Sequence, residues 1–188
     1  SVRILLSSAT AQRVAPGNHS DQLGRYLMTH PAATIFGLFP EETYPHQGVT
    51  AGQLLNHDDY DKKDAPGGFG SSQWMIGHAI KPHDLLGYGT NRPDITGAAL
   101  APWLKRASRH LGNMTLVCED IALPDNRITL SEKVGPEGIA YAHAHHDLDA
   151  TAAARWTQRM SEGADIIRAA GASEVWSGPR IGQHIMGG

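Results

Sequence analysis

The pattern that most constrains the fold is a long amphipathic stretch over residues 151–170. Its small and apolar residues recur at helical spacing along one face: Trp156, Met160, Gly163, Ile167 and Ala170. Such a face is stable only when another layer of structure covers it. Gly171 follows at the position where a helix often ends on a left-handed residue. The stretch therefore predicts one long helix packed on a second layer.

A second helix is predicted over residues 100–111, where apolar side chains again fall at helical spacing and Gly112 follows as a stop signal. Short β-leaning runs occupy much of the remaining sequence: residues 34–39, 72–76, 114–123, 127–130 and 139–146. The chain therefore combines strands with at least two helices.

Pro124, Asp125 and Asn126 provide turn chemistry between residues 114–123 and residues 127–130. These two runs therefore predict a β-hairpin. Strands in hairpin order with helices between them predict an α+β fold, a mostly antiparallel β-sheet backed by helices.

Charge and composition exclude several classes of partner. The chain of 188 residues carries 16 basic and 19 acidic residues, a net charge of −3, with no block of Lys or Arg. This argues against binding to nucleic acid or to an acidic membrane surface through counterion release. No apolar run approaches the length of a membrane span. The single cysteine, Cys118, excludes an internal disulfide and predicts a buried, inert thiol, but does not fix the compartment.

Both ends of the sequence look interrupted. Residues 1–10 are rich in apolar residues without a polar lead-in, and the sequence stops on Gly187 and Gly188. Natural termini usually trail off in polar residues. We therefore expect the chain to be a piece of a longer protein, with a first helix that is buried.

A histidine cluster lies near residue 145. His143 and His145 are two residues apart, so on a strand both could reach one metal ion, and Asp147 continues that face. A metal-dependent enzyme such as a hydrolase is one hypothesis. The alternative is a pair of partly exposed histidines at a strand end, since no distant third or fourth ligand is evident.

His184 is a candidate acid–base residue. It is followed closely by Gly187 and Gly188, and a glycine turn lets another group approach the backbone. Imidazole exchanges protons near neutral pH. A capping or core-edge role for His184 is equally compatible with the sequence.

Four segments resemble the glucose–methanol–choline (GMC) oxidoreductases, in the order found in that family. Residues 3–9 and 23–31 resemble a Leu-Leu-x-Ser helix followed by Gly-Arg-x-Leu-Met-x-His; residues 118–130 resemble the Glu…Pro-x-Asn-Arg-Val-x-Leu hairpin. Residues 184–188 resemble the His-x-Met-Gly-Gly motif. The resemblance covers nearly all of this chain but only the middle to late part of a family member.

The resemblance implies a fold and a cofactor. It places residues 1–30 at the edge of an FAD-binding domain, residues 31–174 in a substrate-binding domain similar to the C-terminal domain of FAD-linked reductases, and residues 175–188 in a return segment. The N-terminal Gly-x-Gly-x-x-Gly unit through which GMC enzymes bind FAD is not in this sequence. FAD would therefore be held by other segments of the same protein, and the fragment alone is expected to be inactive.

The resemblance also implies a reaction. GMC enzymes oxidise the CH–OH group of an alcohol, sugar or polyol: a histidine takes the hydroxyl proton while hydride passes to flavin N5. His184 stands at the position of that histidine, and its partner residue would lie beyond residue 188. Aromatic and hydrogen-bonding residues suit a polyol, which makes four residues candidates for substrate contact: Trp74, Tyr141, His143 and His145. A non-catalytic carbohydrate-binding module remains a further hypothesis.

Overall fold

A computed structural model of the chain describes residues 1–50, 53–58, 60 and 71–187, and these form two compact units. The sheet unit comprises Pro31–Glu119 and Thr151–Ile181. The hairpin unit comprises Ser1–His30, Asp120–Ala150 and Gly182–Gly188. Residues 120–150, which the sequence analysis grouped with the substrate-binding domain, thus cluster with the N-terminal segment.

The described residues form a mostly antiparallel sheet, a separate two-stranded sheet and four α-helices, which confirms the predicted α+β class. The larger sheet has the strand order β2 (Leu54–Asn56), β3 (Ser72–Ile76), β4 (Leu111–Cys118), β1 (Met28–Leu38) and β7 (Glu174–Ser177), and β8 (Ile181–Met186) also pairs with β1. Every neighbouring pair from β2 to β7 is antiparallel.

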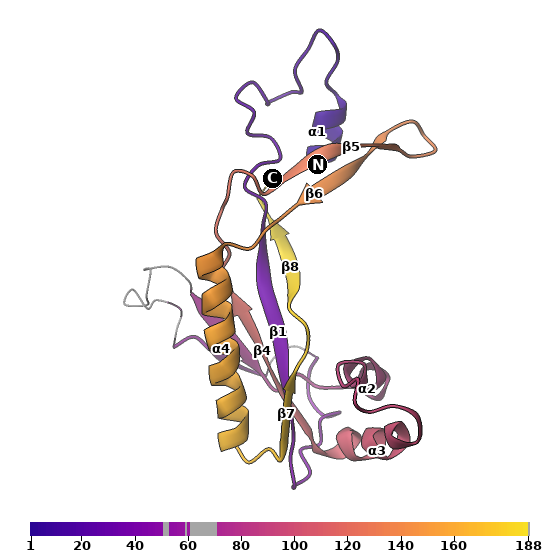
Figure 1. The fold of residues 1–188 in the computed structure, drawn as a ribbon, viewed down its shortest axis with the longest axis vertical. Coiled ribbons are helices and arrows are strands. Elements are labelled where there is room, and N and C mark those ends of the chain that lie inside the picture. The colour runs from indigo at the N-terminus through magenta and orange to yellow at the C-terminus, as the bar shows by residue number, and fades with distance from the viewer. Residues whose placement is uncertain (51–52, 59, 61–70, 188) are drawn as a thin grey trace. The chain divides into compact units, whose positions relative to one another are not determined.

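Helix α4 (Ala150–Ala169) covers one face of the sheet unit, as the amphipathic pattern predicted (Figure 1). Its apolar face packs on Ile35, Trp74 and Met114. Contact is close at Gly163, where a Cβ atom would lie 2.2 Å from Trp74 Cη2. A glycine is therefore required in the middle of this helix despite its low helix propensity. Gly171 ends the helical region with a φ of +100°.

Helices α2 (Pro82–Gly89) and α3 (Leu100–His110) pack on the opposite face. A short 3₁₀ turn at Gly97–Ala99 lies between them and leads directly into α3. Successive strand residues point to opposite faces, so Phe36 and Leu38 meet Leu85 and Trp103 here while Ile35 faces α4. The predicted second helix is confirmed. It ends at His110 because β4 begins at Leu111.

The predicted hairpin between residues 114–123 and 127–130 is wrong. Strand β5 (Arg127–Val134) pairs instead with β6 (Ala140–His145), in a sheet of its own. The turn before β5 does form, with Asn126 N–H donating to Leu123 O at 3.2 Å. However, β1 and β3 occupy both edges of β4, so no edge remains for β5. The predicted strand over residues 139–146 is confirmed as β6.

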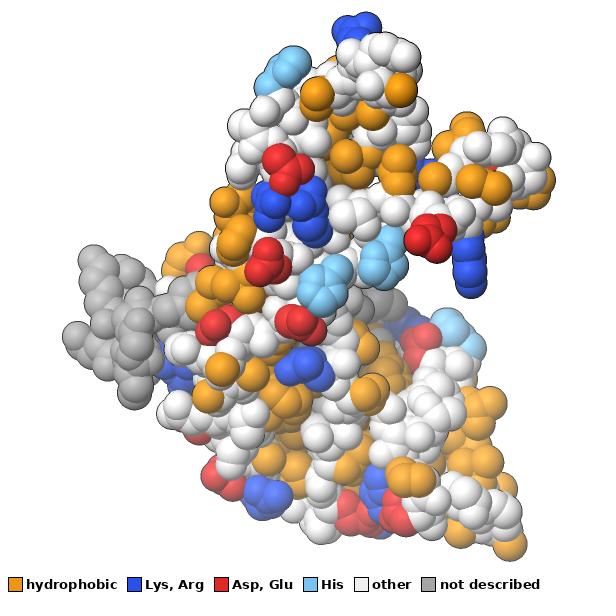
Figure 2. All heavy atoms as spheres, turned by 45° about the horizontal axis from the view of Figure 1, so that its top comes forward, with side chains coloured by type: hydrophobic (Ala, Val, Ile, Leu, Met, Phe, Trp, Pro, Cys, Tyr) orange, Lys and Arg blue, Asp and Glu red, His pale blue; other side chains and the backbone are white. Residues whose placement is uncertain are grey.

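The hairpin unit has little hydrophobic core. Within the described residues its fully buried apolar side chains are Ala15 and Leu27. Helix α1 (Val2–Ser7) buries no residue, and Ile4 is 66% exposed, so the expectation of a buried first helix is wrong. Figure 2 shows hydrophobic side chains exposed on one face of the molecule.

Polar contacts hold this unit together instead. Arg3 Nε donates to Ala140 O at 2.8 Å, which ties α1 to β6. Arg25 and Arg127 both pair with Asp21, at 2.5 and 3.3 Å. The two arginines lower the pKa of Asp21 to about 2 by donating hydrogen bonds to its carboxylate.

Within the described part of the chain, no helix combines the length and the apolar character needed to cross a bilayer.

Candidate functional site

His184 lies on β8 in the hairpin unit with its side chain exposed. Its backbone is left-handed, with a φ of +52°, which is uncommon for a residue other than glycine. Gly187 follows with a φ of +72°, and a Cβ atom there would lie 2.1 Å from Tyr26 O. The glycine turn after His184 thus lets two backbone segments meet, and the unusual conformation marks His184 as a candidate functional residue.

A second imidazole stands beside it. The ring of His30, from β1, lies 5.7 Å from the ring of His184 at an interplanar angle of 84°, an edge-to-face arrangement. The pairing of β8 with β1 brings the two residues together. Sequence reasoning did not single out His30, although it falls within residues 23–31, the second of the four segments that resemble GMC enzymes.

A buried carboxylate anchors the residue before His30. Asp120 has a fully buried side chain, and its Oδ2 accepts hydrogen bonds from Thr29 N at 3.0 Å and from His146 Nε2 at 2.6 Å. Its Oδ1 accepts from Ile121 N at 2.8 Å. These partners satisfy both carboxylate oxygens, so Asp120 fixes the start of β1 and thereby the backbone that carries His30. No local pattern in the sequence points to this residue.

Three of the predicted substrate residues share one strand. Tyr141, His143 and His145 alternate along β6 and are all exposed. His145 Nε2 lies 3.3 Å from Asp147 Oδ2, and the Arg3 guanidinium lies 6.0 Å from the centre of the Tyr141 ring. These side chains could meet a ligand without any rearrangement of the strand.

The metal hypothesis gains no further ligand from the structure. Across the described residues, no group of three or more His, Cys, Asp or Glu side chains is arranged to hold a metal ion. His143 and His145 lie opposite Thr129 and Arg127 of β5, and neither of these partners is a metal ligand of the usual kind.

Trp74 occupies a different environment from the other predicted substrate residues. It is 4% exposed and packs under α4 in the core of the sheet unit. Its ring has no exposed face to offer a ligand. The sequence could not distinguish it from an exposed aromatic residue. Its burial depends on the close approach of α4 at Gly163, which is 89 positions away along the chain.

Cys118 is buried, as predicted. Burial raises the pKa of its thiol to about 12, although Arg155 and Arg159 act in the opposite direction. The thiolate is therefore scarce at neutral pH, and Cys118 does not qualify as a nucleophile.

Comparison with known proteins adds no family assignment. No family model matches the chain, and no curated protein matches it significantly. The resemblance to GMC enzymes therefore rests on the four sequence segments themselves.

Proposed function

We propose that this chain forms the substrate-binding part of an FAD-dependent oxidoreductase of GMC type, which oxidises a CH–OH group of an alcohol, sugar or polyol. One observation carries the proposal. The imidazole of His184 is exposed beside that of His30, at the position to which the resemblance assigns the catalytic base.

In this proposal His184 acts as a general base. A neutral imidazole accepts the proton of the substrate hydroxyl, and the resulting alkoxide character makes the carbon a better hydride donor. The edge-to-face contact with His30 places a second imidazole beside the proposed base. General-base catalysis of this kind contributes about 10²–10⁴-fold to a rate.

The residues of β6 are proposed as substrate contacts. Tyr141 offers an aromatic face, and His143 and His145 offer ring nitrogens from the same exposed side of the strand. Hydroxyl groups of a sugar or polyol are recognised by this combination of stacking and hydrogen bonding.

The residues present fit the substrate side of a flavin site and not its nucleotide side. The exposed His184 suits a base that faces a ligand, whereas the sequence has no Gly-x-Gly-x-x-Gly loop to cradle the pyrophosphate. FAD, held by other segments of the protein, would supply the two-electron acceptor for the hydride.

The test uses the protein as the cell makes it, purified without added cofactor. We expect a visible flavin spectrum that bleaches when a panel of alcohols, sugars and polyols is added without oxygen, with at least one of them active. A protein that carries no flavin, or whose flavin no member of the panel reduces, would contradict the proposal.

A further inference from the structure

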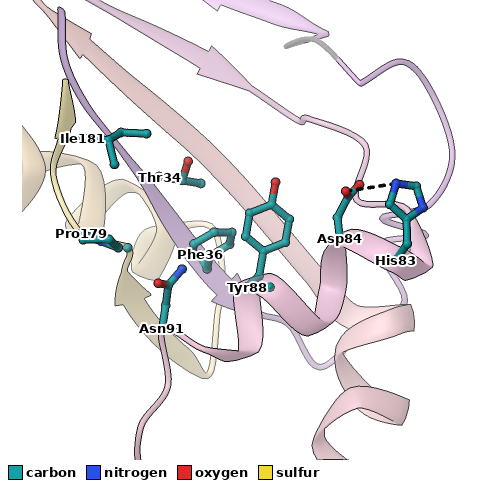
Figure 3. A pocket seen from close by; sticks show the side chains of 10 residues that line it. Thr34, Phe36, His83, Asp84, Tyr88, Asn91, Pro179 and Ile181 are labelled. Atoms are coloured by element: carbon teal, nitrogen blue, oxygen red, sulfur yellow. Dashed lines mark ion pairs between the residues drawn. The ribbon is translucent and has the colours of Figure 1, made fainter. Parts of the chain in front are cut away.

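The sheet unit contains an open cleft that does not include His184. Its volume is about 480 Å³, and it lies between β1, the exposed side of α2 and the segment after β7. Figure 3 shows Tyr88 on α2 and Asn91 just after this helix. Thr34 on β1 lies across the cleft from them, together with Pro179 and Ile181. This volume falls within the range of small-molecule sites.

The base of the cleft is aromatic and firmly packed. Phe36 is 1% exposed, and its ring lies 4.9 Å from that of Tyr88 and 5.5 Å from that of Trp176. These neighbours hold Phe36 in place, so the Tyr88 ring next to it forms a stable apolar wall. Aromatic surfaces of this kind stack against the C–H faces of ring compounds.

Uncommitted polar groups surround this wall. Within the described residues, neither the Tyr88 hydroxyl nor the Asn91 side-chain amide has a hydrogen-bond partner in the protein. The Thr34 hydroxyl shares one hydrogen bond with that of Thr115, at 2.8 Å, and retains further capacity. Donors and acceptors are thus available together, as a ligand with several hydroxyl groups requires.

The charges at the cleft disfavour an anion. His83 and Asp84 form a pair at 3.2 Å at its edge, and among the described residues that line it there is no Lys or Arg. Burial raises the pKa of Tyr88, and the nearby Asp84 carboxylate raises it further, so the phenol stays neutral and can donate a hydrogen bond. A phosphate or carboxylate would meet the Asp84 carboxylate, and no Lys or Arg among the described lining residues would balance it.

From these observations we infer that the cleft binds a neutral cyclic polyol of monosaccharide size. The ring stacks on Tyr88, and its hydroxyl groups bond to the Tyr88 hydroxyl, the Asn91 amide and the Thr34 hydroxyl. The inference does not depend on the proposed oxidoreductase activity, because every residue of the cleft lies in the sheet unit and no cofactor takes part.

Saturation-transfer NMR on the 188-residue chain tests the inference with D-glucose, myo-inositol and glucose 6-phosphate as probes. We expect saturable binding of the two neutral compounds and weaker binding of the phosphate. Tyr88→Phe and Asn91→Ala should each weaken binding about 2–10-fold, the value of one hydrogen bond. Tyr44→Phe, which removes a hydroxyl at a different cleft of the same unit, is the matched control and should change nothing.

Two results would overturn the inference. One is the absence of saturable binding of both neutral probes. The other is binding that Tyr88→Phe and Asn91→Ala leave unchanged while His184→Ala or Tyr44→Phe reduces it, because the ligand would then occupy another site. Loss of binding in His184→Ala alone would support the proposed oxidoreductase site while refuting this one, so the two failures are distinguishable.

Discussion

The two units of the molecule are stabilised in different ways. The sheet unit buries apolar side chains on both faces of its sheet, against α4 on one side and against α2 and α3 on the other. In the hairpin unit the fully buried apolar side chains, within the described residues, are Ala15 and Leu27. There, hydrogen bonds and ion pairs fix the backbone, and the histidines proposed to act on substrate are exposed.

This difference separates two sources of stability, apolar packing and polar pairing. Core residues of the sheet unit should report mainly on folding when they are changed, because their side chains contribute packing, whereas the residues that line its cleft should report on ligand binding. Residues of the hairpin unit should report on local geometry, because their contacts are polar and specific.

Trp74 and Tyr141 provide the sharpest contrast, since both were predicted to contact substrate. Trp74→Ala should lower the free energy of unfolding by about 3–5 kcal/mol, because it leaves a cavity under α4. Tyr141→Ala, at a residue that is 48% exposed, should change it by less than about 0.5 kcal/mol. Urea unfolding followed by circular dichroism measures both. Equal effects of the two changes would contradict the assignment of Trp74 to the core.

Gly163 tests how closely α4 approaches the sheet. Gly163→Val should cost about 2–3 kcal/mol, because the new side chain would overlap Trp74 and Ile35. The control is Gly87→Ala in α2, where nothing lies within 4 Å of the added Cβ atom and helix propensity should add up to about 1 kcal/mol of stability. If Gly163→Val proved as stable as the natural protein, α4 would have to lie farther from the sheet.

Asn126 tests the polar network of the hairpin unit. Its side chain donates to Asp147 O at 2.9 Å and accepts from Asp147 N at 2.8 Å, and the residue is 1% exposed. Asn126→Ala should therefore lower stability by about 1–2 kcal/mol by leaving the Asp147 backbone groups unpaired. Hydrogen exchange of the Asp147 amide should accelerate at the same time. Unchanged protection of that amide would rule out the pairing.

Asp21 should give the smallest effect, confined to acid pH. Its pKa is lowered from the ordinary value of 3.8 to about 2, so its contribution is present above pH 3.8 and is lost as the pH falls through about 2. Asn also tolerates the positive φ found at this position. Urea midpoints of Asp21→Asn and the natural protein should thus differ above pH 3.8 and converge near pH 2. Asp125→Asn removes a longer and more exposed ion pair with Arg25, at 3.9 Å from a side chain that is 93% exposed, and should change the midpoint less. A constant difference down to pH 2 would contradict the ion pairs.

The sequence predicted both long helices of the sheet unit and part of its strands because these elements follow apolar periodicity, whereas α2, β2 and β7 were not predicted. Helix α4 and strand β3 lie where the patterns put them. The hairpin at Asn126 was predicted wrongly because turn chemistry is local, whereas the occupation of both edges of β4 is decided by strands far away in the sequence.

The candidate site was less accessible to sequence reasoning. His184 stood out through its glycine turn, but the contact with His30 spans most of the chain and has no local signature. The same holds for Asp120, whose partners Thr29 and His146 come from separate segments. Polar pairing between distant residues follows no periodicity, so only the folded structure reveals it.

The most direct test of the proposed function is the alcohol-dependent turnover of the intact flavin-containing protein with His184→Ala. We predict that kcat falls by about 10²–10⁴-fold while flavin content stays the same, because the base is lost but no cofactor contact is. His19→Ala, which removes another exposed histidine of the hairpin unit, should leave kcat unchanged. Normal turnover in His184→Ala at equal flavin content would contradict the claim that this imidazole takes the proton of the substrate.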